Sequence, residues 1–135
     1  MSPENRKANI ADELAAARRA RATAALNATA GDRSAAVNRL YYAAFHAARA
    51  VCLTEGLEAK THRGLKHLLL LHFVEPGRLP EWTGEVLARL ETKRDLADYA
   101  ASYEIAPATY DTLADEADRL LAAIDAFLRA GGWTV

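Results

Sequence analysis

No stretch of this chain alternates apolar and polar residues as a half-buried β-strand does, and this absence restricts the fold most. Alanine is abundant, and the β-branched residues are scattered. Apolar residues instead recur at helical spacing, most clearly at Tyr110, Leu113, Ala117, Leu120, Ile124 and Phe127. A weaker helical stripe precedes them at Ile10, Leu14, Ala17, Ala24 and Ala28. The sequence therefore predicts an all-α protein.

Glycine, proline and capping residues divide this helical pattern into five segments. The predicted helices span about residues 4–30, 33–54, 62–74, 80–99 and 107–130. Glycines end three of them, short polar side chains cap two starts, and prolines open two others. These residues are Gly31, Gly56 and Gly131–Gly132, then Asp32 and Thr61, then Pro80 and Pro107. Because short connections join long helices, we expect an antiparallel helical bundle of about five helices, with the short third helix lying across it.

The length of 135 residues suits one domain, so we expect residues 1–135 to form a single helical domain with its core at about residues 10–130. The start of the chain, MSPENRKANI, has no apolar segment typical of a secretory signal. The longest apolar run, residues 68–71, is too short to cross a bilayer, so no membrane association is expected. The single cysteine, Cys52, excludes an internal disulfide and reads as a core residue. These features predict a cytoplasmic protein.

Charge is distributed unevenly along the chain. Residues 1–66 hold eleven Lys and Arg against six acidic residues, a net of +5, whereas residues 67–135 hold six against twelve, a net of -6. A basic half can meet phosphate or an acidic partner. Alternatively, the two halves complement each other within the fold.

The segment NRLYYAAFHAAR, residues 38–49, carries an unusual polar stripe without any acidic residue. At about 100° per residue, its polar side chains share one arc of about 100°, and alanines and larger apolar residues fill the rest of the helix. The stripe comprises Asn38, Arg39, Tyr42, His46 and Arg49. One interpretation is structural, with Tyr and His hydrogen-bonded in the core and Arg39 paired with an acid. The other is a groove that binds phosphate and bases through arginine forks, stacking and an imidazole.

A second candidate group is RDLADY, residues 94–99, on the fourth predicted helix. Arg94 follows Leu90 by one helical turn and therefore lies on the apolar face of that helix. An inward arginine requires a carboxylate, a carbonyl or a ligand. One interpretation is a buried pair of Arg94 with Asp98 that fixes the register of two helices, and the other is a binding site.

Three motifs in this order, namely YYAAFHAA, KTHRG and RDLADY, resemble the small prokaryotic HEPN-domain proteins. The resemblance runs from about residue 33 to residue 128. It implies a bundle of about five helices that forms homodimers. It also implies a partner, since such proteins are often encoded beside a minimal nucleotidyltransferase, as toxin with antitoxin.

Many HEPN proteins are metal-independent endoribonucleases, and the resemblance implies this activity as an expectation. Their site is an arginine followed four to six residues later by a histidine, in which the arginine neutralises the phosphorane and the histidine transfers a proton. This chain departs from that pattern, because Arg94 is followed by Asp98 and Tyr99 instead. We expect His46 on the second helix to supply the missing imidazole, so that Arg94 and His46 are the candidate catalytic residues. Nucleotide transfer onto Tyr99 by the partner would add negative charge beside Arg94 and silence the site.

His62 is a further candidate for binding phosphate, since it starts the third helix beside Lys60 and Arg63. Packing against the second helix is its structural alternative. His67 and His72 lack the spacing of a helical metal pair, so neither a metal nor another cofactor is expected.

The candidate binding residues are Asn38, Arg39, Tyr42, His62, Asp98 and Tyr99. The expected function is a HEPN-type protein of a toxin–antitoxin or nucleotidyltransferase system that binds RNA or nucleotide and cleaves RNA without metal. The alternatives are a non-catalytic partner or substrate-binding subunit of a minimal nucleotidyltransferase, and a purely structural bundle.

Overall fold

The computed structural model describes residues 2–99 and 102–135, and this part of the chain forms five α-helices and no β-strand. The helices are α1 (Pro3–Thr29), α2 (Arg33–Leu53), α3 (His62–Leu69), α4 (Glu81–Tyr99) and α5 (Pro107–Ala130). A π-helical segment, η1 (Leu70–Val74), continues α3. The all-α prediction is confirmed.

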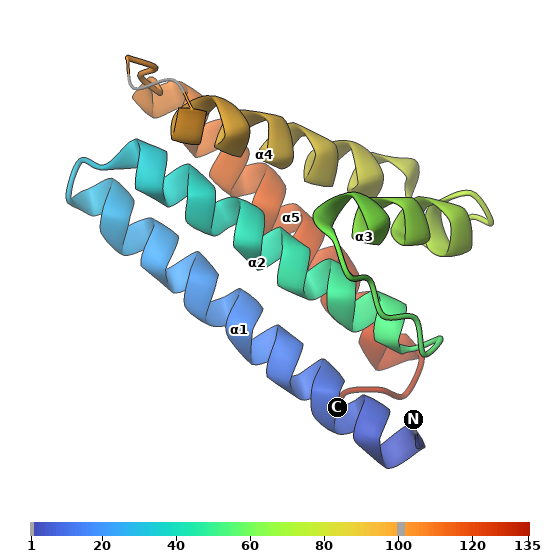
Figure 1. Ribbon diagram of the computed structural model, residues 1–135. Coiled ribbons are helices and arrows are strands. Elements are labelled where there is room, and N and C mark those ends of the chain that lie inside the picture. Colours follow the sequence, from blue (N-terminus) through green and yellow to red (C-terminus); the bar gives the residue numbers. More distant parts are fainter. Residues whose placement is uncertain (1, 100–101) are drawn as a thin grey trace.

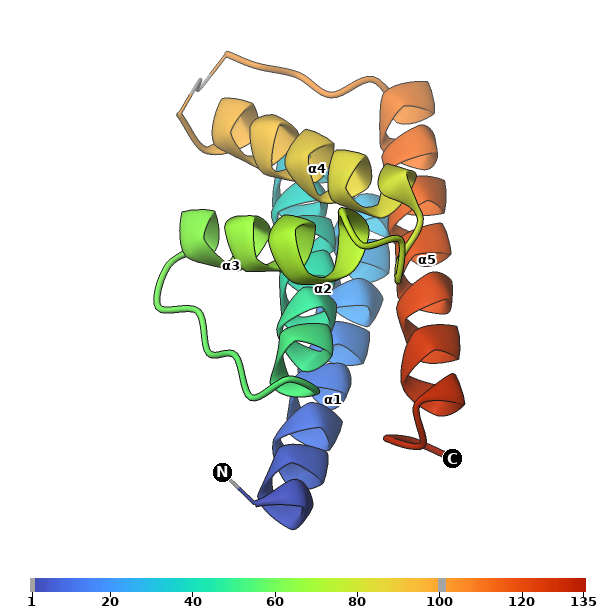
Figure 2. The same ribbon diagram turned by 90° about the vertical axis from the view of Figure 1, so that its right-hand side faces the viewer.

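The central helix is α2, which contacts α1, α3, α4 and α5. It runs antiparallel to α1 and in the same direction as α5, and these three helices lie side by side (Figure 1). Both α3 and α4 cross the direction of the other three helices (Figure 2). The sequence predicted a crossing only for the third helix. The crossing of α4 matters for function, because it carries RDLADY across one face of α2.

The helix ends follow the predicted chemistry closely. The side chain of Asp32 accepts a hydrogen bond from the Ala35 N–H at 3.1 Å, and the Thr61 hydroxyl accepts one from the Gly64 N–H at 2.9 Å. Gly31 has a φ of 85°, a conformation that favours glycine. In contrast, α4 begins one residue after Pro80, whose carbonyl accepts the Thr83 N–H at 3.1 Å.

The π-helical segment was not predicted. Its defining bond runs from the Glu75 N–H to the Leu70 carbonyl at 2.8 Å, five residues back. The apolar pattern of the sequence does not distinguish this wider turn from an α-helical one, because one residue shifts the face only locally.

The core is built on the apolar side of α2. Val37, Leu40 and Val51 on this side are fully buried. Buried alanines lie among them, and their small side chains let neighbouring helices approach closely. The predicted stripe of α1 is buried except for half-buried Ala28, and that of α5 is buried except for half-buried Phe127. Cys52 is buried in the same core, as predicted.

An ion pair links the basic first half of the chain to the acidic second half. Arg21 on α1 donates to Asp118 on α5, with its Nε 2.6 Å from Oδ1. The hydrogen bond to this carboxylate raises the pKa of the Arg21 guanidinium. At this contact the two halves complement each other within the fold. None of the helices in the described part of the chain is long and apolar enough to span a membrane.

Candidate functional site

Tyr42 lies at the centre of a cluster of cationic and aromatic side chains between α2, α3 and α4. The guanidinium carbon of Arg39 stands 4.9 Å from the centre of its ring, and that of Arg94 stands 5.9 Å away. The rings of His46 and His62 lie with their centres 6.5 Å and 5.7 Å from it. Two guanidinium groups and two imidazoles thus surround one half-buried phenol ring. We call these five residues the Tyr42 cluster.

Arg94 reaches the cluster from α4. Its side chain is 18% exposed, which agrees with its predicted inward direction. One terminal nitrogen donates to the Tyr42 hydroxyl at 3.4 Å, and the guanidinium stacks 4.9 Å from the centre of the Tyr41 ring. The other terminal nitrogen donates to the Asp95 carboxylate at 2.6 Å. The predicted partner Asp98 stands 4.0 Å from Nε, which is too long for a hydrogen bond, so buried Nε has no hydrogen-bond partner.

The charge of Arg94 is secured by this environment. Burial lowers the pKa of the guanidinium and is the largest single influence, but the hydrogen bond to Asp95, the charge of that carboxylate and the nearby Tyr42 and Tyr41 together raise the pKa above its usual value. Arg94 is therefore cationic at physiological pH, with one donor that no residue of the described chain satisfies. A cationic arginine donates hydrogen bonds to anionic oxygens.

His46 is oriented by a residue of α1. Its Nδ1 lies 2.7 Å from Oε2 of Glu13, and Arg49 approaches the other oxygen of the same carboxylate at 3.5 Å. An ionised carboxylate only accepts hydrogen bonds, so Nδ1 of His46 carries the proton. In the neutral imidazole, Nε2 is then free to accept a proton. The Tyr42 ring and the Glu13 carboxylate therefore fix the orientation of the His46 imidazole.

His62 packs against α2, which was its structural alternative. Its ring stacks on Phe45 with centres 4.5 Å apart, and its Nδ1 lies 2.6 Å from the hydroxyl of Tyr41. That hydroxyl also lies 3.4 Å from the carboxylate of Glu91. Because Tyr41 has one hydroxyl proton, it can donate to only one of these groups at a time. When it donates to His62, the imidazole presents Nε2–H as a donor.

Buried Tyr41 remains protonated in this arrangement. Desolvation by burial raises the pKa of its hydroxyl well above the usual value, and the nearby Glu91 carboxylate raises it further. The ring therefore serves as a neutral platform beneath the Arg94 guanidinium and beside His62.

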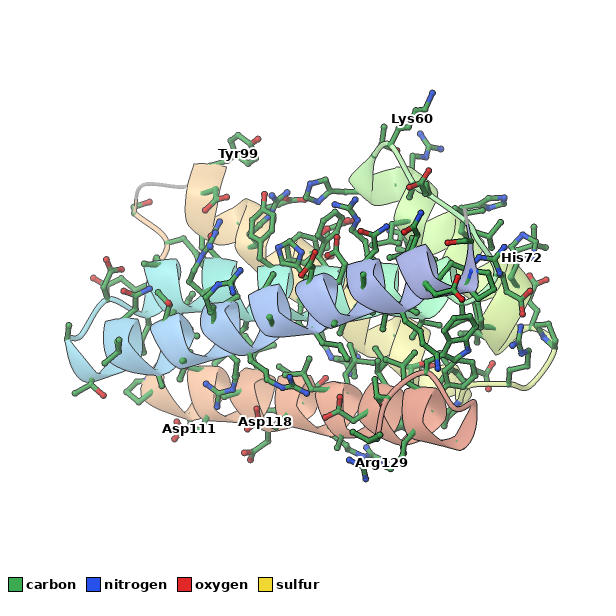
Figure 3. The ribbon with its side chains drawn as sticks, turned by 90° about the horizontal axis from the view of Figure 1, so that it is seen from below. Lys60, His72, Tyr99, Asp111, Asp118 and Arg129 are labelled. Carbon is green, nitrogen blue, oxygen red and sulfur yellow. The ribbon has the colours of Figure 1, made fainter. Side chains whose placement is uncertain are left out.

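The remaining predicted residues divide into near and far groups. The side-chain oxygen of Asn38 accepts a hydrogen bond from Arg39 at 2.7 Å, and its amide nitrogen donates to Asp98 at 3.4 Å. Asn38 and Asp98 therefore lie next to the Tyr42 cluster. Tyr99 is different: it is 85% exposed and projects from the end of α4, away from the body of the bundle (Figure 3). No contact joins His46 directly to Arg94 in the described residues; Tyr42 contacts both.

Four residues at this site were missed by the sequence argument. Tyr41 was assigned to the apolar arc, although its hydroxyl bonds a histidine. Glu13 and Glu91 lie on α1 and α4, and no local signal in the sequence connects them to α2. Asp95 is adjacent to Arg94 in the sequence, and helical spacing predicts partners three or four residues away.

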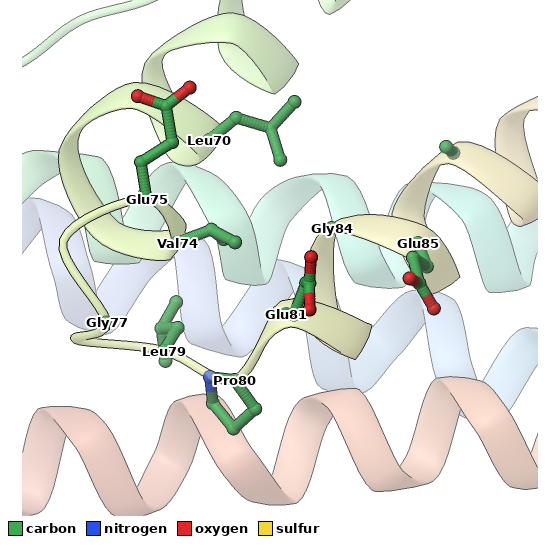
Figure 4. A pocket seen from close by; sticks show the side chains of 10 residues that line it. Leu70, Val74, Glu75, Gly77, Leu79, Pro80, Glu81, Gly84 and Glu85 are labelled. Atoms are coloured by element: carbon green, nitrogen blue, oxygen red, sulfur yellow. The ribbon is translucent and has the colours of Figure 1, made fainter.

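A separate groove of about 730 Å³ lies between η1 and the first half of α4 (Figure 4). None of the predicted site residues lines it. Within the described residues, no three His, Cys, Asp or Glu side chains are grouped so as to hold a metal ion.

The described chain is thus an all-helical bundle with a cation–aromatic cluster between α2, α3 and α4. A model of the HEPN domain matches residues 11–131, which is most of the chain. The protein therefore belongs to the HEPN-domain family, as its motifs predicted.

Curated relatives match part of this domain. Over 64 residues the chain is 41% identical to a protein of Methanocaldococcus jannaschii named as a candidate toxin, covering 47% of this chain and 48% of that one. It is 39% identical over 66 residues to a UPF0332 protein of Gloeobacter violaceus, covering 49% and 52%. It is 33% identical over 69 residues to a UPF0332 protein of Thermotoga maritima, covering 51% and 52%. The chain spans about half the length of the curated relatives it matches.

Proposed function

We propose that this protein is the toxin component of a toxin–antitoxin pair, that it binds RNA through the Tyr42 cluster, and that it cleaves RNA without metal. Its partner in this proposal is a minimal nucleotidyltransferase, and its active form is a homodimer in the cytoplasm. The observation that carries the proposal is the gathering of two guanidinium groups and two imidazoles around Tyr42. The toxin part of the proposal is supported by two relatives from Methanocaldococcus jannaschii that are named as candidate toxins.

The cluster has the chemistry needed to hold a phosphodiester. Arg39 and Arg94 bring two guanidinium groups to the Tyr42 ring. Arginine binds phosphate in a forked geometry, and aromatic rings stack on bases without sequence preference. Asn38 and His62 supply further donors at the edges of the cluster.

Cleavage requires a base and a group that stabilises negative charge. His46, with its Nδ1 proton held by Glu13, accepts the proton of the ribose 2′-OH at Nε2. The 2′ oxygen attacks the adjacent phosphorus, Arg94 stabilises the charged phosphorane, and the P–O5′ bond breaks as the 5′ oxygen takes a proton from solvent water. The products are a 2′,3′-cyclic phosphate and a 5′-hydroxyl end.

A second function has its own supporting observation. Arg94 is already bound to Asp95 at 2.6 Å and His46 to Glu13 at 2.7 Å, so both catalytic candidates have internal partners. This arrangement suits a non-catalytic subunit that docks a nucleotidyltransferase and holds its substrate. The exposed hydroxyl of Tyr99 is accessible for nucleotide transfer by such a partner.

RNA cleavage in excess EDTA tests the proposal, with the wild type beside Arg94→Ala, His46→Ala and the distant surface variant Arg129→Ala. We expect cleavage by the wild type and by Arg129→Ala, and none by the other two. Equal cleavage by all four proteins means contamination. If none cleaves while RNA binding depends on Arg94, the non-catalytic subunit is correct. Intact mass after co-expression with a neighbouring nucleotidyltransferase tests transfer onto Tyr99, and an unchanged mass argues against it.

A further inference from the structure

The groove between η1 and α4 has an apolar floor that the chain leaves open. Leu70, Val74 and Leu79 contribute to it, and Leu70 remains 36% exposed (Figure 4). An exposed leucine in an apolar concavity is typical of interaction sites.

Gly84 closes the bottom of this groove. A Cβ atom at this position would lie 2.7 Å from a methyl carbon of Leu70, so the Leu70 side chain packs directly on the backbone of α4 at Gly84. The groove is therefore a formed surface feature with a packed floor. A volume of about 730 Å³ is comparable with that of small-molecule and peptide sites.

Carboxylates stand on both banks of the groove. Glu75 lies on the η1 side, and Glu81 and Glu85 lie one turn apart on the α4 side (Figure 4). Within the described residues, none of the three forms an ion pair. One turn beyond Glu85, Arg89 donates to Glu116 at 2.8 Å and interacts with Glu85 only through its charge, without a hydrogen bond.

Helix stability explains only part of this charge. Negative charge is favourable in the first turn of a helix, which accounts for Glu81. Glu75 follows the carboxyl end of η1, where the helix dipole disfavours a carboxylate. Its position is understandable if a cation from outside the chain neutralises it.

We propose that this groove binds an amphipathic helix of a partner protein, one that carries leucine-like side chains on one face and Lys or Arg along both edges. The apolar face covers the floor, and the basic edges pair with Glu75 on one bank and with Glu81 and Glu85 on the other. Such a helix places its apolar anchors at i, i+3 or i+4 and i+7, and basic residues four apart on one edge match the single turn between Glu81 and Glu85. This surface is distinct from the Tyr42 cluster, so the partner and RNA occupy different faces.

The probe is a fluorescein-labelled amphipathic peptide of about 18 residues, or five turns, with a leucine face and lysine edges. A second peptide replaces every lysine with glutamate. Fluorescence anisotropy with the full chain is expected to show binding of the basic peptide alone. The triple variant Glu75→Gln/Glu81→Gln/Glu85→Gln should bind the basic peptide at least about tenfold more weakly.

The matched control is Asp12→Asn/Asp111→Asn/Asp115→Asn, which removes the same charge from exposed positions on α1 and α5. It should bind like the wild type. Ala88→Arg places a cation inside the groove and should abolish binding, whereas Ala122→Arg on α5 should not. Amide NMR spectra should show the largest shifts at the groove glycines, Gly77 and Gly84.

Four results would overturn the proposal. They are no binding of the basic peptide, equal weakening by the control triple variant, shifts that map outside the groove, and Ala88→Arg binding as tightly as the wild type. Self-association of the free chain that the Glu triple variant abolishes would instead assign the groove to a second copy. Thermal unfolding of each variant verifies that it folds.

Discussion

The two sides of α2 differ in the side chains that they bury and in the free energy of burying them. One side buries aliphatic residues such as Val37 and Leu40 among alanines, and these side chains carry no polar group. The other side places Arg39, Tyr42 and His46 at half-buried positions. Burial of apolar surface stabilises the fold in proportion to area, whereas half-burying charged groups costs free energy unless partners compensate.

The compensation on the polar side is incomplete, which points to function. Asp95 and Glu13 each bind one candidate catalytic residue, yet a buried nitrogen of Arg94 has no hydrogen-bond partner within the described chain. A bundle selected only for stability gains nothing from this arrangement. The apolar side of α2 therefore holds the bundle together, whereas the polar side carries the proposed RNA site.

A cavity on the apolar side of α2 should destabilise the protein more than any change on the polar side. Leu40→Ala removes a fully buried side chain, and we expect it to lower the free energy of unfolding by about 3 kcal/mol. Tyr42→Phe, on the polar side of the same helix, removes only a 3.4 Å hydrogen bond and should lower it by less than about 1 kcal/mol. Urea unfolding measures both. Equal destabilisation would mean that the Tyr42 cluster is part of the structural core.

The fold was predictable because its signals are local. Period, glycine stops and caps such as Asp32 and Thr61 act within a few residues, so they can be read along the chain. The crossing of α4 and the π-helical segment depend on how helices pack, and the sequence pattern alone does not contain that information.

The candidate site was predictable in part. The polar stripe of α2 and the inward direction of Arg94 follow from helical spacing, and the structure brings them together at Tyr42. The contacts of Glu13 with His46 and of Glu91 with Tyr41 join residues far apart in sequence. Such pairs appear only once the helices are packed.

On the polar side of α2, the planar fork of Arg94 should contribute to RNA affinity beyond its positive charge. Arg94→Lys keeps the positive charge but loses the planar fork that contacts Tyr42 and Asp95 together. We expect RNA affinity to fall about tenfold, with little change in stability. Arg129→Lys on the exposed face of α5 is the control. Filter binding at fixed salt measures both, and an unchanged affinity for Arg94→Lys would remove the fork from the proposed binding mode.

Alkaline pH should weaken the apolar side first. Burial raises the pKa of the Cys52 thiol to about 12, and burial also raises that of the Tyr41 hydroxyl. Both groups ionise at lower pH in the unfolded chain than in the native one, so the unfolded state loses its protons first. The free energy of unfolding should therefore be constant below about pH 8 and fall by about 1 kcal/mol by about pH 9.

Urea unfolding at several pH values measures this dependence. Cys52→Ala, which removes the thiol, should flatten most of the decline. In the native protein the thiol should also resist alkylation at pH 8 and react fully after denaturation, because it is buried. Rapid alkylation of the native protein would show that the apolar side of α2 opens readily.

In the proposed binding mode, the Asp95 carboxylate competes with RNA for the guanidinium of Arg94. The Asp95 carboxylate holds one terminal nitrogen at 2.6 Å, so phosphate must share or displace it. Asp95→Asn keeps the shape, removes the negative charge, and should raise RNA affinity about threefold while steepening its salt dependence. Asp111→Asn on α5 removes an equal charge at a distance and controls for net charge. A lower affinity for Asp95→Asn would mean that the carboxylate positions Arg94 for the ligand, and the polar side of α2 would then be preorganised by its partners, with no competition between Asp95 and phosphate.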